Sequence, residues 1–283
     1  TIENVNASWA GLKAVEKNHA YVLTAENGDA VVDSAQAATD GSNSVGIVGT
    51  GYNDTLYATA GTHIYNGGGG SRVVSDVNVW TAEGGMDIVD YKLAGSTALN
   101  IDLSKTGMQD TGFGSARFVN IEGLAGGNGD DVFTGNTADN FFEGRGGNDT
   151  FNIGSGGQDT LLYKLINASD ATGGNGSDVV NGFTVGTWEG TADTDRIDLR
   201  DLLSDSGYTG TGSASYVNGV ATLDSSAGNI ADYIRVVQNG SNTEIQVDLD
   251  GTGGQFSPTT LVTLNGVQTD LATLLANHQL LIA

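Results

Sequence analysis

The sequence predicts an all-β fold in which short parallel strands stack in the coils of a β-solenoid, followed by antiparallel strands and one short helix. The first observation behind this prediction is composition: the 283 residues include 44 Gly and one Pro, and Asp outnumbers Glu 26 to 8. Gly and Asp favour tight turns, whereas Glu favours helices, so helix should be scarce. The second observation is a nine-residue pattern that recurs from Gly126 onward, because a fixed short period is typical of stacked repeats.

Charge and residue chemistry narrow the classes of function. The chain carries 34 acidic and 11 basic side chains, a formal charge of −23. This balance argues against nucleic acid and anionic membrane surfaces, which need a basic face, and favours cations as partners. No apolar run approaches the ~18 residues that span a bilayer, so no membrane insertion is expected. The absence of Cys excludes disulfides and thiolate zinc sites. Because the chain begins at Thr1 without a Met or an export leader, we expect a monomeric module of a longer protein.

The repeats have the form G-G-x-G-x-D-x-U-x, where U is a large apolar residue. Consecutive units read GGNGDDVFT from Gly126, GNTADNFFE, GRGGNDTFN and, after one extra residue, GSGGQDTLL; a further unit, GGNGSDVVN, begins at Gly173. Four of these units carry Asp in the sixth place: Asp131, Asp149, Asp159 and Asp178. Weaker units between residues 49 and 90 carry in that place Asp54, His63, Arg72 and Asp87. The glycines permit a turn of positive φ, and the apolar residue should point into a core.

The spacing of the acids predicts a cation site. Two units make one coil of 18 residues, and Asp131 and Asp149 are 18 residues apart, so their turns should stack. Asp159 and Asp178 are 19 apart, which predicts that they stack on the opposite edge with one bulged residue. Stacked turns would surround a cation with about six carboxylate and carbonyl oxygens, which suits Ca²⁺ better than Mg²⁺. Without the cation the carboxylates would repel one another, so the metal-free segment should be largely unfolded. For an isolated turn such as the one at Asp87, a strand cap is an equally good explanation.

From Gly126 to Asn181 these units resemble the calcium-binding β-roll of RTX proteins, a family that type I secretion exports. The resemblance implies that each ion lies between successive turns and is bound by the Asp of both turns and by backbone carbonyls. One edge would use Asp131 and Asp149 with the carbonyls of Gly126, Asn128, Gly144 and Gly146. The other edge would use Asp159 and Asp178 with the carbonyls of Gly154, Gly156, Gly173 and Asn175. Asp54 and Asp87 are further candidates, whereas Asn140 should weaken its site and Arg72 should exclude an ion.

Residues 183–283 have the pattern of antiparallel hairpins. Strands are expected at 183–185 and 196–199, turns at Asn218-Gly219 and Asn239-Gly240, and a short helix capped by Asp270 or Thr269. The region resembles the C-terminal secretion segment of RTX proteins, in the version that ends large biofilm adhesins. The resemblance implies that an ABC transporter reads the end of the chain, for which we select Asp270, Leu271, Leu274, Leu275, Leu280, Leu281 and Ile282. The loop with Asp248 and Asp250 either binds another calcium ion or is a solvated turn.

The expected division of the chain has four parts. They are an N-terminal lead-in or degenerate solenoid (1–48), degenerate RTX-like coils (49–120), the calcium-binding β-roll (121–182), and a C-terminal cap with the type I secretion signal (183–283). The expected function is a non-catalytic module for calcium-dependent folding and type I secretion of an RTX adhesin. It would be disordered in the low-calcium cytosol, pass the ABC transporter and an outer-membrane channel, and fold outside a Gram-negative cell.

Two alternative functions stay open. The chain could be the carrier module of a secreted hydrolase or epimerase whose catalytic domain lies upstream, or residues 1–120 could present a glycan-binding face. The chain itself is not expected to be an enzyme, because it contains no H-E-x-x-H, G-x-S-x-G or P-loop motif.

Overall fold

The computed structural model describes residues 53–67, 85–154, 156–189, 191–204, 206–210, 213–224, 226 and 229–283, together with the backbone of four strands nearer the N-terminus. The chain divides into two compact units, Thr1–Gly127 and Asn128–Ala283. The boundaries of the four-part division expected from the sequence, after residues 48, 120 and 182, stay predictions. Arg72, where no ion was expected, lies outside the described residues.

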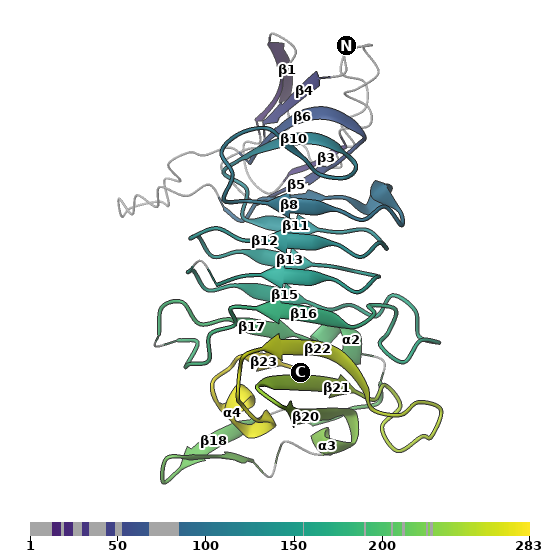
Figure 1. Ribbon diagram of the computed structural model, residues 1–283, viewed down its shortest axis with the longest axis vertical. Helices are drawn as coiled ribbons and strands as arrows, with labels where there is room; N and C mark the ends of the chain where they lie inside the picture. Colours follow the sequence, from purple (N-terminus) through teal and green to yellow (C-terminus); the bar gives the residue numbers. More distant parts are fainter. Residues whose placement is uncertain are drawn as a thin grey trace. The chain divides into compact units, whose positions relative to one another are not determined.

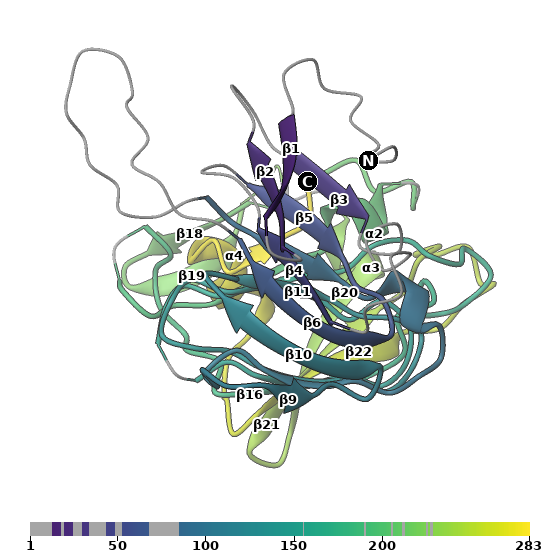
Figure 2. The same ribbon diagram turned by 90° about the horizontal axis from the view of Figure 1, so that it is seen from above.

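The described strands of the first unit form parallel and mixed sheets. One of these sheets is mixed. Its central strands β2, β4, β6 and β10 run parallel to one another in that order, and at its two ends β1 is antiparallel to β2 and β9 is antiparallel to β10. Figures 1 and 2 both show β4, β6 and β10 as neighbours. These strands are β1 (Lys13–Lys17), β2 (Ala20–Thr24), β4 (Ser44–Val48), β6 (Gly61–Asn66), β9 (Gln109–Asp110) and β10 (Gly114–Val119). A parallel set contains β3 (Ala30–Asp33), β5 (Asp54–Tyr57), β7 (Ile88–Asp90) and β11 (Gly123–Ala125). The 3-10 helix η2 (Lys92–Ala94) and strand β8 (Asn100–Asp102) lie between β7 and β9 in the chain.

In the second unit, strands from consecutive repeats belong to different sheets. One set pairs β12, β14, β16 and β22 in parallel and then adds β21 and β20 in antiparallel order. The other pairs β13, β15, β17 and β23 in parallel. The first set is β12 (Val132–Thr134), β14 (Thr150–Asn152), β16 (Asp178–Asn181), β22 (Thr259–Asn265), β21 (Asn242–Val247) and β20 (Ile234–Asn239). The second set is β13 (Phe141–Glu143), β15 (Thr160–Leu162), β17 (Arg196–Asp198) and β23 (Leu280–Leu281).

Further short elements occupy the C-terminal part of this unit (Figure 1). They are the antiparallel hairpin of β18 (Ala214–Val217) and β19 (Val220–Leu223) and the helices α2 (Arg200–Leu203), α3 (Ile230–Tyr233) and α4 (Leu271–Ala276).

The apolar eighth residue of each repeat builds the core between these strand sets. Phe133, Phe142 and Phe151 are at most 1% exposed, as are Leu161 and Val180 in the next two units. Phe142 belongs to β13, yet its ring centroid lies 6.1 Å from that of Phe133 and 5.9 Å from that of Phe151. Side chains from the two sets therefore interleave. Burying each one contributes about 1.5–3 kcal/mol, which makes this column of side chains the main source of cohesion.

The predicted fold class, an all-β parallel β-roll or β-solenoid with an antiparallel cap and one short helix, is wrong. The structure consists of parallel and mixed sheets with several short helices among its described residues. Strand β22 shows the difference most clearly, since it is parallel to β16 and antiparallel to β21. The predicted cap is therefore part of a mixed sheet and does not form a separate layer. The prediction treated the hairpins of residues 183–283 as a separate cap, whereas β22 continues the parallel pairing of the repeats through its register with β16.

Local predictions in the C-terminal part had mixed outcomes. The Asn218-Gly219 turn is confirmed, with φ of 51° and 79° between paired Val217 and Val220. The helix capped by Asp270 is also confirmed, because its carboxylate accepts a 2.8 Å hydrogen bond from the Thr273 amide. The strand expected at 183–185 does not form, and Phe183 is instead a buried core residue in a loop. None of the described helices is long and apolar enough to cross a membrane.

Candidate metal sites

The sixth residues of three repeats form a hydrogen-bonded column along one edge of the second unit. The amide of Asp131 donates to Oδ1 of Asp149 at 2.8 Å, and the amide of Asp149 donates to Oδ1 of Asp178 at 2.8 Å. All three residues are 1% exposed. We call this set, Asp131, Asp149 and Asp178, the Asp149 column. Asp149 and Asp178 thus each use one carboxylate oxygen to hold the preceding turn, and the other oxygen makes no hydrogen bond.

The second carboxylate oxygen of this column is buried without a partner. Oδ2 of Asp149 and Oδ2 of Asp178 make no hydrogen bond, although both atoms are inaccessible to solvent. The Tyr163 hydroxyl lies beside the Asp178 carboxylate, so among the described residues Asp149 is the member of this pair that has no neutral side-chain donor beside it. A Cβ placed on Gly144 would overlap Oδ2 of Asp149, while the φ of Gly144 is not positive. This glycine is therefore needed for space beside the carboxylate. A buried anionic oxygen costs several kcal/mol unless a proton or a cation compensates it.

Backbone oxygens stack along the same edge. A Cβ on Gly147 would overlap the carbonyl oxygen of Gly129, and one on Gly176 would overlap that of Gly147. Both glycines have positive φ, 116° and 79°. The fourth residues of successive repeats therefore place carbonyls against the next turn, so glycine is required there for both space and conformation. Gly146 lies beside Asn128, whose Oδ1 is 3.4 Å from a Cβ built on it. Carboxylate oxygens and the carbonyls of Gly129 and Gly147 thus lie along one edge. The carbonyl ligands predicted there, those of Gly126, Asn128, Gly144 and Gly146, stay predictions.

A second column lies on the other edge of the unit. The Asn140 amide donates to Oδ1 of Asp159 at 2.8 Å, and the Asp159 amide donates to Oδ1 of Asp195 at 3.1 Å. Oδ2 of Asp159 is buried without a partner. In contrast, Oδ2 of Asp195 accepts a 2.8 Å hydrogen bond from the Thr184 amide. This set, Asn140, Asp159 and Asp195, is the Asp159 column.

The pKa values of these carboxyls reflect their burial. Burial, assisted by the charge of Asp178, raises the pKa of Asp149 from 3.8 to about 8. Burial, assisted by the charges of Asp195 and Asp139, raises the pKa of Asp159 to about 8. Burial likewise raises the pKa of Asp178 and of Asp195 to about 7. Without a cation these sites hold protons near neutral pH, which is the response of clustered, desolvated carboxyls that lack a positive partner.

The predicted pairing of Asp159 with Asp178 is not found. Asp178 follows Asp149, 29 residues earlier, and Asp159 is followed by Asp195, 36 residues later. The reason is that residues 163–172 form a loop without a strand, so the units beginning at Gly154 and Gly173 fall on opposite edges. Within this segment the amides of Ile166 and Asn167 both donate to the Gly173 carbonyl.

The residues whose carbonyls were predicted as ligands on the second edge do not all lie on that edge. Gly173 and Asn175 lie with the Asp149 column, and the Asn175 side chain donates to the carbonyls of Lys164 and Thr172. Gly154 packs against Gly182, and Gly156, with φ of 101°, lies near Asp193. Gly126 belongs to the first unit and Asn128 to the second.

Sequence reasoning missed Asp195 and, in the first unit, Glu122. The Asp54 amide donates to Oδ1 of Asp87 at 2.8 Å, and the Asp87 amide donates to Oε2 of Glu122 at 3.0 Å. These three residues form an acidic column like those of the second unit. Both missed residues stand two places before a buried apolar residue, Ile197 and Leu124, which is the spacing of the repeats. A search for that shorter signal without the glycines would have found them.

The Asp248–Asp250 loop has a partly separate arrangement. Asp248 is 5% exposed and its Oδ1 has no partner, whereas Asp250 accepts hydrogen bonds from the amides of Gln255 and Phe256. Burial and the neighbouring Asp250 raise the pKa of Asp248. The Asp250 carboxylate thus caps the turn that follows it, and calcium binding by this loop stays a prediction.

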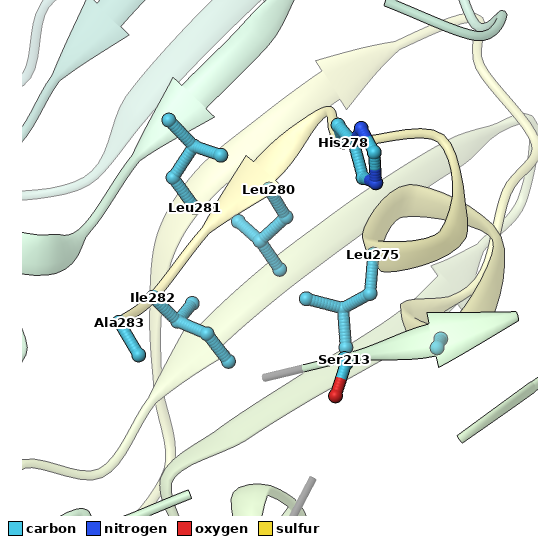
Figure 3. A pocket seen from close by; sticks show the side chains of 8 residues that line it. Ser213, Leu275, His278, Leu280, Leu281, Ile282 and Ala283 are labelled. Atoms are coloured by element: carbon cyan, nitrogen blue, oxygen red, sulfur yellow. The ribbon is translucent and has the colours of Figure 1, made fainter. Parts of the chain in front are cut away.

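The residues chosen as a secretion signal lie on α4 and β23. Leu274, Leu275, Leu280 and Ile282 are at most 4% exposed. Figure 3 shows Leu280 and Ile282 on the side of the strand that faces Leu275, with Leu281 on the other side. A pocket of about 200 Å³ lies beside them, lined also by Ser213 and His278. In the folded chain these side chains are mostly enclosed.

The donor set fits a hard cation. No group of three or more acidic or histidine side chains converges on one point among the described residues, so any ion must take part of its shell from backbone carbonyls. Carboxylates one strand apart, with backbone carbonyls along the same edge, are the kind of oxygen donors from which Ca²⁺ builds a shell of six to eight. No protein-family model matches the chain, and no curated protein matches it.

Proposed function

We propose that this chain is a non-catalytic, calcium-dependent folding module of a protein exported by type I secretion. The observation that carries the proposal is the set of buried carboxylate oxygens without partners on Asp149, Asp159 and Asp178. These atoms recur in stacked turns, and Gly144 leaves room for the one on Asp149. A repeated, costly arrangement of this kind is stabilised by a shared cation, and oxygen donors select calcium.

Calcium concentration then controls folding. Weak extracellular calcium modules have dissociation constants of about 10⁻⁴–10⁻³ M, far above free calcium inside a cell. In the cytosol no cation compensates the buried carboxyls, and burying them with a bound proton or an unpaired charge costs free energy, so the segment stays unfolded and can pass through a narrow channel. Outside, binding free energy becomes folding free energy, and folding opposes return through the channel. The resemblance of the repeats and of the last residues to RTX adhesins supports an ABC transporter and outer-membrane channel as export partners and the cell surface as the destination.

A calcium titration of chelated protein tests the proposal. Each ion contributes about 2.7 kcal/mol when calcium is 100 times its dissociation constant. For a domain of this size, each such ion should raise Tm by about 5–10 °C, and the β-type circular dichroism signal should grow as calcium binds. Magnesium at the same concentration should do much less. Equal melting temperatures in EDTA and in calcium would contradict the proposal.

A matched pair of variants localises the effect. Asp149→Asn keeps an acceptor for the Asp131 amide but removes the charge, so it should lower the calcium-induced rise in Tm. Asp201→Asn, at the exposed start of α2, should leave that rise unchanged.

A further inference from the structure

The C-terminal strand is held by one fully buried amide side chain. Gln279 is 0% exposed, and its Nε2 donates to the carbonyl of Thr184 at 2.8 Å and to the carbonyl of Asp195 at 2.7 Å. Its Oε1 accepts a 3.0 Å hydrogen bond from the Gly186 amide. The backbone of Gln279 also accepts from Ile197 at 2.8 Å, which begins the pairing of β23 with β17. The end of the chain is thus bound to the segment that carries Asp195.

The same segment is bound to the last complete repeat of this edge. Asp195 accepts from the Asp159 amide, and Gln158 Nε2 donates to the Trp188 carbonyl at 2.7 Å and to Thr194 Oγ1 at 3.2 Å. Trp188 in turn donates its amide to the carbonyl of Asn277, just before β23, and its ring stacks 4.0 Å from the Arg196 guanidinium. A continuous set of hydrogen bonds therefore joins the Asp159 turn to the C-terminal residues.

Resting on the calcium proposal above, we propose that a calcium ion at Asp159 and the docking of β23 are coupled through Asp195 and Gln279. The ion cancels the repulsion between Asp159 and Asp195. It thereby holds the loop that carries Asp195 in the position in which that loop can hydrogen-bond with the Gln279 side chain. The docked loop in turn places Asp195 against the Asp159 turn. Calcium binding therefore encloses Leu280 and Ile282, and calcium removal releases them. A transporter that reads the end of the chain can reach these residues only before calcium binds.

The other column provides an internal control. The Asp149 column ends at Asp178, the first residue of β16, and β16 pairs with β22. None of the hydrogen bonds that hold Gln279 involves that column. Loss of an ion there should destabilise the unit without selectively releasing β23. Gln279 is a positioning residue in this scheme, because it acts on Asp159 through Asp195.

Hydrogen exchange of the full chain in calcium tests the coupling. Asp159→Asn preserves the acceptor for the Asn140 amide and removes the charge, and it should speed exchange of the amides of residues 279–282 by about tenfold relative to those of β12 and β14. Asp149→Asn should not produce this selective change. Gln279→Ala should lower the number of bound calcium ions by one in calorimetry, whereas Gln268→Ala, at an exposed glutamine, should leave the number unchanged.

Trp188 gives an independent readout. In a chain that also carries Trp9→Phe and Trp80→Phe, Trp188 is the single tryptophan. Calcium should shift its fluorescence emission. Asp159→Asn should abolish this shift, and Asp149→Asn should retain it. Should Gln279→Ala fail to fold, the two Asp variants still decide the matter. If calcium binds and Asp159→Asn leaves residues 279–282 protected, the coupling is refuted while the folding proposal stands. If no calcium binds to the unmodified chain, the folding proposal itself fails.

Discussion

The two acidic columns of the second unit are built from the same hydrogen bond but end in different kinds of sequence. In the Asp149 column all three members are sixth residues of repeats, and every member is an acid. In the Asp159 column the first member is Asn140, and the last is Asp195, which lies in a loop outside the repeats. Stacked turns are therefore what builds a column, in both kinds of sequence. Asp195, two places before buried Ile197, joins the Asp159 column without the glycines of the motif.

The difference in charge predicts different numbers of ions. Asp149 has an acidic neighbour in both directions, so Asp149→Asn should remove two calcium ions, whereas Asp159→Asn should remove one. At calcium 100 times the dissociation constant the losses are about 5 and about 3 kcal/mol. Calorimetric stoichiometry and chemical denaturation in calcium measure both quantities. Equal losses in the two variants would show that Asn140 serves as a ligand as well as Asp does.

The converse change should add an ion. Asn140→Asp would give the Asp159 column a second carboxylate pair, so one further calcium ion is expected, with a gain of about 2.7 kcal/mol in excess calcium. In EDTA the same variant should be less stable than the parent, since it adds a buried charge. A gain in EDTA, or no extra ion in calcium, would break the proposed equivalence of the columns.

Glycine at the first position of a repeat should matter more in the Asp149 column. Gly144→Ala places a methyl group on the Asp149 carboxylate, and overpacking of this kind costs about 1–3 kcal/mol. Gly154→Ala meets only the Gly182 backbone, at 3.0 Å, and should cost less. Gly107→Ala, with nothing within 4 Å, serves as the control. Thermal denaturation in calcium would rank the three variants, and a reversed rank would contradict the geometry.

The pH dependence of the metal-free chain tests the burial of the carboxyls in the two columns, because protonation relieves their repulsion without adding ligands. The folded pKa values of Asp149 and Asp159, about 8, lie above the unfolded value of 3.8, so the folded chain binds more protons between these limits. Stability of the metal-free chain should therefore be greatest below pH 4 and fall as the pH rises from 4 toward 8. Saturating calcium should flatten this dependence above pH 6. Melting curves in EDTA at pH 5 and pH 8 measure the dependence in the metal-free chain, and greater stability at pH 8 would contradict the raised pKa values of Asp149 and Asp159.

Prediction from sequence worked where the chain decides its structure locally. The apolar residues Phe133, Phe142 and Phe151 were placed in the core, and the 18-residue interval from Asp131 to Asp149 appears as a direct hydrogen bond. The Asn218-Gly219 turn and the Asp270 cap also follow from short-range geometry. The fold class was wrong, because the same pattern of short strands is compatible with several ways of pairing at their edges.

By itself, the sequence determined the turn and core positions, since glycine conformation and the burial of every eighth residue depend on neighbours a few places away. Only the tertiary structure decided which acids share an edge, how the C-terminal strands join the sheets, and that Gln279 is buried against Asp195. Those outcomes depend on the path of the loop at 163–172 and on contacts between residues as much as 95 places apart. Such contacts are chosen by the free energy of the whole fold, which no local pattern records.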